Sequence, residues 1–236
     1  MVGDSHAGSL RSGVQMAVKG KMAFAFMAQS SHYFGMLDPE PRLPQLYEHV
    51  GQGDVVLLAS RLTLTQRPVY FRGTGSSHPY ASDPRVLAHY ATGLLPWLRR
   101  VGAKLVLLGD NYGLSRDGSL CRPTARTNPC AYSEASILSG FGCGSHQAPN
   151  GRCPSPSHNA LRQYEAAMQA FADEHHDVVH FFPQLDLWLT PDGQGSNLIP
   201  GTRTNGYVDQ GHVNRQGSLY LWPFLCDAFE RWGFFD

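Results

Sequence analysis

Short runs of apolar residues alternate with amphipathic stretches along this chain, and this alternation restricts the fold more than any other feature. The runs predict strands at 22–28, 54–60, 104–109 and 178–182. Three of them are continuously apolar, as is typical of strands covered on both faces of a parallel sheet. With helices between the strands, the pattern predicts an α/β fold, a three-layer α/β/α sandwich around a mostly parallel five-stranded sheet.

Capping residues and apolar spacing predict three helices between the strands. The first is expected over 9–18. The second is expected over 83–101, with Asp83 as N-cap, a proline at the first helical position and a glycine directly after its end. The third is expected over 157–176, where apolar residues recur every three to four positions.

The first five residues have the pattern of a strand end that runs into a glycine-containing turn and a helix. Almost nothing precedes them, so the first strand of the sheet is expected to be truncated. The chain is expected to be one domain over 1–236, and the truncated strand indicates that this domain is a fragment of a longer protein. Ligands of such sheets bind at the carboxyl ends of the strands, and function is expected there.

Charge and composition exclude several classes of function. Lys and Arg number 19, as do Asp and Glu, so no net positive charge attracts nucleic acid. The 42% hydrophobic content is that of a folded domain rather than a disordered chain. The apolar stretches are shorter than the roughly 18–20 residues of a membrane span. The acidic and histidine residues at 173–177 are interpreted as a solvated polar turn, and no metal site is expected.

Four of the five cysteines lie in a Gly- and Pro-rich stretch over 109–156: Cys121, Cys130, Cys143 and Cys153. At least eight residues lie between neighbouring cysteines of this group, whereas zinc ligands are typically spaced about two to four residues apart within a pair. The spacing favours two loop-closing disulfides, whose pairing stays open among three possibilities, and it implies an oxidising compartment. Cys226 is expected to be a buried thiol.

Two motifs near the ends of the chain carry reactive side chains. Gly3-Asp4-Ser5-His6 is expected at a strand-to-helix turn, where a serine hydroxyl lies at the sheet edge beside the N–H groups of a helix end. Asp209-Gln210-Gly211-His212 precedes a helix, and this spacing lets the carboxylate bond Nδ1 of the histidine while Nε2 takes a proton from a hydroxyl. A structural alternative makes Ser5 and Asp209 helix caps and His212 a surface residue. His6 is expected to pack or bond locally.

In this order, the Gly-Asp-Ser and Asp-x-x-His motifs resemble those of the SGNH (GDSL-type) hydrolase superfamily. Gly-Asp-Ser-His-Ala at 3–7, the strand at 54–61, the cysteine-containing loop and Asp-x-x-His-x-x-x-x-Gly at 209–217 further resemble the SGNH domain appended to membrane-bound O-acyltransferases. The resemblance implies Ser5 as nucleophile, His212 as general base and acid, and Asp209 as the residue that orients His212. It implies no cofactor.

The resemblance is weakest at the oxyanion hole. The superfamily usually supplies the serine N–H, a glycine N–H and an asparagine side chain after the third strand. Gly109-Asp110-Asn111 has the Gly-x-Asn letters but ends the fourth predicted strand, whereas Ser60-Arg61 follows the third. Membrane-acyltransferase SGNH domains have an arginine there, so Arg61 is expected to contact the acyl oxygen or the substrate, with Asn111 as second choice. A structural ion pair is an open alternative for Arg61.

The function that the resemblance implies is serine-dependent transfer of a small acyl group, such as acetyl, to a carbohydrate hydroxyl. Two alternatives stay open: a carbohydrate or lipid esterase with the same triad, and a non-catalytic glycan-binding module. A transmembrane acyltransferase domain is expected upstream. It would tether this domain outside the cytoplasm, in a periplasmic, luminal or extracellular location.

Overall fold

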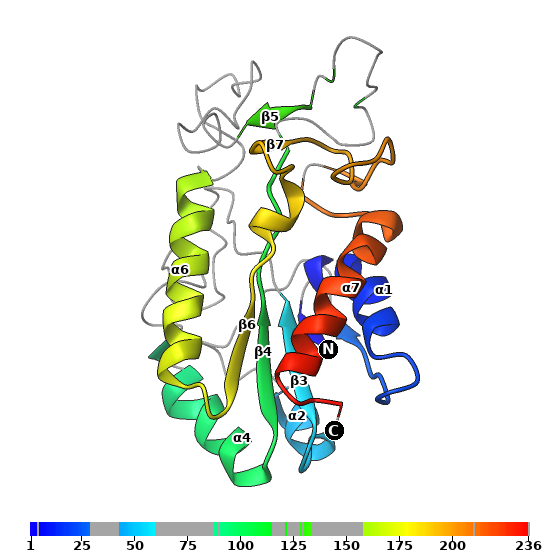
Figure 1. Cartoon of the computed structure of the whole chain (residues 1–236). Coiled ribbons are helices and arrows are strands. Elements are labelled where there is room, and N and C mark those ends of the chain that lie inside the picture. The colour runs from blue at the N-terminus through cyan, green and yellow to red at the C-terminus, as the bar shows by residue number, and fades with distance from the viewer. Residues whose placement is uncertain are drawn as a thin grey trace, which may run out of the picture.

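The computed structural model describes residues 1–3, 5–28, 43–59, 87–88, 90–114, 121, 128, 130–133, 158–209 and 211–235, and Figure 1 shows the chain. Three residues named above for the site or for disulfides, Arg61, Cys143 and Cys153, lie outside this part of the chain. Ser5, Asp209, His212 and Asn111 lie within it.

Five parallel strands form the central sheet, in the order β2-β1-β3-β4-β6. Their bounds are β1 Val2–Gly3, β2 Met27–Ala28, β3 Val55–Ala59, β4 Lys104–Leu108 and β6 Val179–Phe182. In register, Leu58 of β3 lies opposite Val2 of β1 and Leu107 of β4. The sheet confirms the predicted α/β fold. The predicted strand at 22–28 is shorter than expected, since only its last two residues pair with β1.

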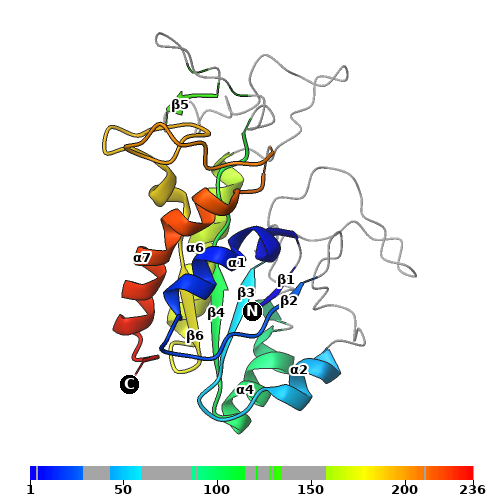
Figure 2. The ribbon, with the colours of Figure 1, turned by 90° about the vertical axis from the view of Figure 1, so that its right-hand side faces the viewer.

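Helices cover both faces of the sheet (Figures 1 and 2). One face carries α1 and α7 and the other carries α2, α4 and α6, with bounds α1 Ser5–Ala17, α7 Arg215–Arg231, α2 Leu43–His49, α4 Leu95–Val101 and α6 His158–Glu174. Alternate side chains of β3 supply two cores, because successive residues of a strand point to opposite faces. Leu57 and Ala59 pack with α1 and α7, whereas Val56 and Leu58 pack with α4 and α6.

The second predicted helix is irregular where it is described. A π-helical turn, Tyr90–Leu94, leads into α4. Pro96 stands in the first turn of α4, where it has no N–H to donate and its ring excludes the carbonyl four residues earlier, which disfavours a regular α-helix across this point. The helix ends at Gly102, whose φ of 75° is the left-handed conformation that glycine adopts without strain.

Helices α1 and α7 pack unusually close together, side by side in Figure 2. A Cβ atom at Gly13 would lie 2.0 Å from the carbonyl oxygen of Ser218, so only glycine fits there. The Gly13 N–H donates to Ser218 Oγ at 2.7 Å, and Ser218 is fully buried. This contact fixes the helix that begins with Ser5 against the helix that follows His212.

A second, antiparallel sheet of β5 (Tyr132–Ser133) and β7 (Gln194–Gly195) lies above the upper ends of β4 and β6 in Figure 1. A 3₁₀ helix, Leu185–Trp188, connects β6 to this region. The sequence analysis did not predict these elements, because two-residue strands and one helical turn leave no periodic pattern.

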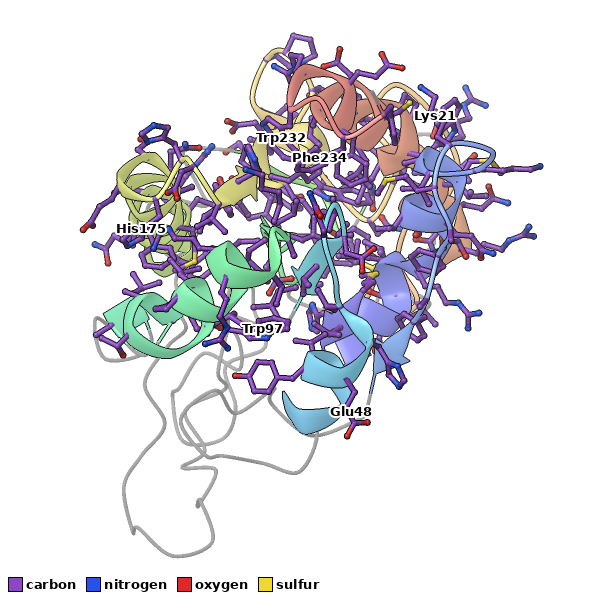
Figure 3. The ribbon with its side chains drawn as sticks, turned by 90° about the horizontal axis from the view of Figure 1, so that it is seen from below. Lys21, Glu48, Trp97, His175, Trp232 and Phe234 are labelled. Carbon is purple, nitrogen blue, oxygen red and sulfur yellow. A yellow bond between two sulfur atoms is a disulfide. The ribbon has the colours of Figure 1, made fainter. Side chains whose placement is uncertain are left out.

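Aromatic side chains pack together at the end of the molecule opposite β5 and β7, which Figure 3 shows from below. Trp232 and Phe234 follow α7, with ring centroids 5.6 Å apart, and Trp232 stacks on His180 of β6 at 4.9 Å. Trp97 of α4 meets Tyr47 of α2 edge to face at 4.5 Å.

Among the described helices, none combines the length and the apolar character needed to cross a membrane.

Candidate active site

Ser5 occupies the turn where β1 ends and α1 begins. At Gly3, with φ 153°, an added Cβ would lie 1.6 Å from the Ala59 carbonyl oxygen and 2.7 Å from the Ala7 side chain. Glycine is therefore required where the chain passes the end of β3. The resulting turn makes Ser5 the first residue of α1, four residues before the predicted helix start, at the carboxyl edge of the sheet.

Backbone hydrogen bonds join the two ends of the loop that carries Asp209 and His212. Tyr207 and Val213 form an antiparallel bridge, and the Val208 N–H donates to the His212 carbonyl at 2.9 Å. Directly after it, Asn214 caps α7 by accepting the Gly217 N–H at 3.0 Å. The loop is thus anchored to the first turn of α7, which packs on α1.

The three residues of the two end motifs form one hydrogen-bonded chain. Ser5 Oγ lies 2.7 Å from His212 Nε2, and His212 Nδ1 lies 2.7 Å from Asp209 Oδ2. The other carboxylate oxygen, Oδ1, accepts the N–H groups of Gly211 and His212, both at 2.8 Å. A carboxylate accepts the proton on Nδ1, which leaves Nε2 free to accept the Ser5 hydroxyl proton.

The environment of Asp209 favours its ionised form. Partial burial raises the pKa of this carboxyl, but the hydrogen bonds from the Gly211 N–H, the His212 ring and the His212 N–H outweigh burial and hold the pKa below its ordinary value. The side chains of His212 and Asp209 are 22% and 43% exposed. An ionised carboxylate therefore supports an imidazole that solvent and a substrate can reach.

Asn111, the second choice for the acyl-oxygen contact, lies close to this site but has a different arrangement from the one expected. Its Nδ2 donates to the carbonyls of Gly211 at 3.1 Å and Tyr112 at 3.2 Å. Both amide hydrogens are therefore directed at backbone oxygens rather than into the space beside Ser5 Oγ, and a contact of Asn111 with an acyl oxygen stays a prediction. The residue instead joins the end of β4 to the His212 loop.

His6 was expected to pack or to bond locally; it is buried and packed, but its hydrogen bond is long-range. Its Nδ1 lies 2.9 Å from Oδ1 of Asp110, 104 positions away along the chain. Both residues are buried, and the His6 ring lies 4.6 Å from that of His212, measured between centroids. The sequence analysis missed Asp110. The only signal was its place directly after a strand, at the sheet edge where Ser5 was expected.

Among the cysteines that the structure describes, Cys121 and Cys130 of the long loop form a disulfide, whereas the predicted partners Cys143 and Cys153 lie outside the described residues. Cys130 donates its N–H to Asn128 Oδ1, and the Asn128 amide donates to Asn197, which ties the disulfide to the segment that leads to His212. Cys226 is free, as expected, but half-exposed rather than buried.

Replacing Cys121 and Cys130 together by serine is expected to lower the free energy of unfolding by about 2–3 kcal/mol, because a short cross-linked loop restricts the unfolded chain. Urea unfolding of the wild type and the double variant measures this. The Cys226→Ser variant is the control, since its thiol is free. Equal stability of all three proteins would contradict the prediction.

Within the described part of the chain, no three His, Cys, Asp or Glu side chains lie close enough together to hold a metal ion. The acidic turn at 173–177 takes part in an ion pair. Arg99 donates from two nitrogens to the two carboxylate oxygens of Asp177, at 2.6 and 2.8 Å. This pairing lowers the pKa of Asp177 to about 2.

Comparisons with known proteins agree with the resemblance carried by the two motifs. The family model described as "SGNH domain (fused to AT3 domains)" matches residues 1–225. A search of curated protein sequences finds no significant match. Among solved structures, the periplasmic domain of a lipopolysaccharide acetyltransferase from Salmonella ser. Paratyphi A superposes with a TM-score of 0.58 at 13% identity, over 98% of this chain and 82% of that one. A possible lipase from Chitinophaga pinensis superposes with a TM-score of 0.51 at 14% identity, over 99% and 97%. The two superpositions confirm the fold.

Proposed function

This chain belongs to the family of SGNH domains fused to AT3 domains, and we propose that it transfers a small acyl group to a carbohydrate hydroxyl, with Ser5, His212 and Asp209 as its catalytic triad. At the coarser level, the family makes it an acyltransferase or esterase. The observation that carries the triad is the pair of 2.7 Å contacts from Ser5 Oγ to Nε2 and from Nδ1 to the Asp209 carboxylate.

In the proposed reaction, the Ser5 hydroxyl gives its proton to Nε2 of His212 while Oγ attacks the ester carbonyl of an acyl donor. His212 then protonates the departing alkoxide as the carbonyl–oxygen bond of the donor breaks. The acyl group now lies on Oγ. An acceptor hydroxyl loses its proton to His212, attacks the acyl carbon, and the released Ser5 oxygen regains a proton from His212.

The oxyanion of each tetrahedral intermediate needs hydrogen-bond donors. The Ser5 N–H is in the first turn of α1, where amide hydrogens have no carbonyl four residues earlier, and the amino end of the helix favours negative charge. We assign Ser5 N–H as one donor and keep Arg61 as the predicted second contact. The Asn111 side chain is not included, since its amide bonds to Gly211 and Tyr112.

Three observations support the proposed donor, acceptor and location. The family description names a fusion to AT3 domains, which fits a transmembrane acyltransferase that delivers the acyl group. A protein of the same fold is the periplasmic domain of a lipopolysaccharide acetyltransferase, which fits acetyl transfer to a carbohydrate. The Cys121–Cys130 disulfide fits an oxidising, extracytoplasmic compartment.

Labelling with a fluorophosphonate tests the nucleophile. The wild-type protein is expected to form one covalent adduct, and mass spectrometry of its peptides should place that adduct on Ser5. Ser5→Ala is expected to take no label. Ser9→Ala is the matched control, because Ser9 lies one turn further along α1 and its hydroxyl bonds only to the His6 carbonyl among the described partners. A folded wild type without label would favour a glycan-binding module.

Transfer and hydrolysis are separated by the fate of the acyl group. The wild type is incubated with radiolabelled p-nitrophenyl acetate, with and without oligosaccharide, and the products are separated. Label on the sugar is the expected result. Free acetate alone in both reactions would contradict transfer and identify water as the acceptor. Ser5→Ala serves as the blank for both reactions.

A further inference from the structure

A second histidine–carboxylate pair, His6 and Asp110, packs against the pair formed by His212 and Asp209. His6 and Asp110 are joined at 2.9 Å, and their side chains are only 4% and 3% exposed. The His6 ring packs on the His212 ring, with a centroid distance of 4.6 Å and an interplanar angle of 46°. We propose that His6, Asp110 and Asn111 are positioning residues that hold the His212 ring against Ser5. This inference rests on the proposed function.

Two contacts start from the turn after β4, where Asp110 and Asn111 lie: one reaches His6 and the other reaches Gly211. Asp110 accepts from His6, the residue next to Ser5, and so fixes the first turn of α1. Asn111 donates to the carbonyl of Gly211, the residue next to His212. The Asn111 N–H also donates to Oδ1 of Asp110 at 2.9 Å, so the two contacts are joined at their origin. The end of β4 is thereby connected to both halves of the reacting pair.

The topology of the chain does not by itself set the distance between Ser5 and His212. Ser5 and His212 are 207 positions apart, and His212 lies in a loop outside the sheet, so no strand pairing sets their separation. An error of about 1 Å in the position of a catalytic group can cost about 10²-fold in rate. Residues that tie both groups to β4, which pairs with β3 on one side and β6 on the other, limit such errors.

The His6 ring adds a second restraint. An imidazole held by Asp209 through Nδ1 can still rotate about the Cα–Cβ and Cβ–Cγ bonds of its side chain, and this rotation moves Nε2 away from Ser5 Oγ. The ring of His6, itself fixed by Asp110, occupies the space on one side of the His212 ring. His212 is therefore held by a hydrogen bond at one edge and by packing on one face.

None of these residues is expected to touch the ester, so their loss should lower kcat and leave KM nearly unchanged. We expect His6→Phe, which keeps a ring but removes Nδ1, and Asn111→Leu, which removes both donors, each to slow p-nitrophenyl acetate turnover and fluorophosphonate labelling by about 10–100-fold. Asn111→Ser and Asp110→Asn are milder changes at the same contacts, and they are measured if the first pair does not fold.

Met168→Ala is the matched control for lost stability. It removes a side chain that is 1% exposed in the core between α6 and the sheet, on the face opposite α1 and α7. We expect it to lower the melting temperature without slowing labelling. If the wild type takes label and the folded variants of His6, Asp110 and Asn111 label at its rate, or if only KM changes, the positioning role is wrong while the proposed function stands. A wild type that takes no label contradicts the proposed function, and the positioning role with it.

Discussion

The His212→Ala variant is expected to lose about 10⁴- to 10⁶-fold in kcat, the largest effect of any single substitution apart from that of Ser5. Alanine removes the only group in hydrogen-bond contact with Ser5 Oγ among the described contacts of that atom. The hydroxyl then keeps its proton and is a weak nucleophile at neutral pH. Residual turnover would come from binding and from the remaining oxyanion donors.

Steady-state turnover of p-nitrophenyl acetate and the rate of fluorophosphonate labelling both measure this loss. The double variant Ser5→Ala/His212→Ala should be no slower than either single variant, because the two residues act as one unit. His176→Ala is the control: this histidine is exposed near the end of α6 and bonds to the Asp173 carbonyl. Wild-type turnover by His212→Ala would leave the 2.7 Å contact without a catalytic role.

The sequence predicted the elements that have a strong local pattern. The continuous apolar runs at 104–109 and 178–182 became β4 and β6, and the amphipathic stretch at 157–176 became α6, with ends shifted by one or two residues. The start of α1 was placed too late, since the apolar spacing begins beyond Ser5 while the turn at Gly3 lets the helix begin at once.

Several features that the sequence did not predict depend on contacts between distant segments. The β5–β7 pairing joins Tyr132 to Gly195 and has no pattern in either segment. The His6–Asp110 contact links residues 104 positions apart. The Gly-x-Asn spacing identified Asn111 as a candidate, but it could not show that the Asn111 amide bonds to the Gly211 carbonyl. By contrast, the Asp209–His212 contact spans three residues, so its geometry could be worked out from spacing alone.

Asp209→Asn is expected to lower kcat by about 10⁴-fold while the loop keeps its shape. The amide oxygen can still accept the N–H groups of Gly211 and His212, as Oδ1 of Asp209 does. The amide nitrogen, however, is a donor where the carboxylate Oδ2 accepts from His212 Nδ1. The ring must then carry its proton on Nε2, which faces Ser5 Oγ, and Nε2 can no longer take the hydroxyl proton.

This substitution separates the catalytic role of Asp209 from its alternative role as a structural cap. A residue that only accepted the two N–H groups of the loop would be replaced by asparagine at little cost, because asparagine is an equally good acceptor there. Turnover and melting temperature are measured together, with Asp192→Asn as the control, since Asp192 makes a comparable contact, to Thr190, in an exposed turn. Unchanged turnover in Asp209→Asn would show that the carboxylate supports the loop alone, whereas a large loss at an unchanged melting temperature assigns its charge to the orientation of His212.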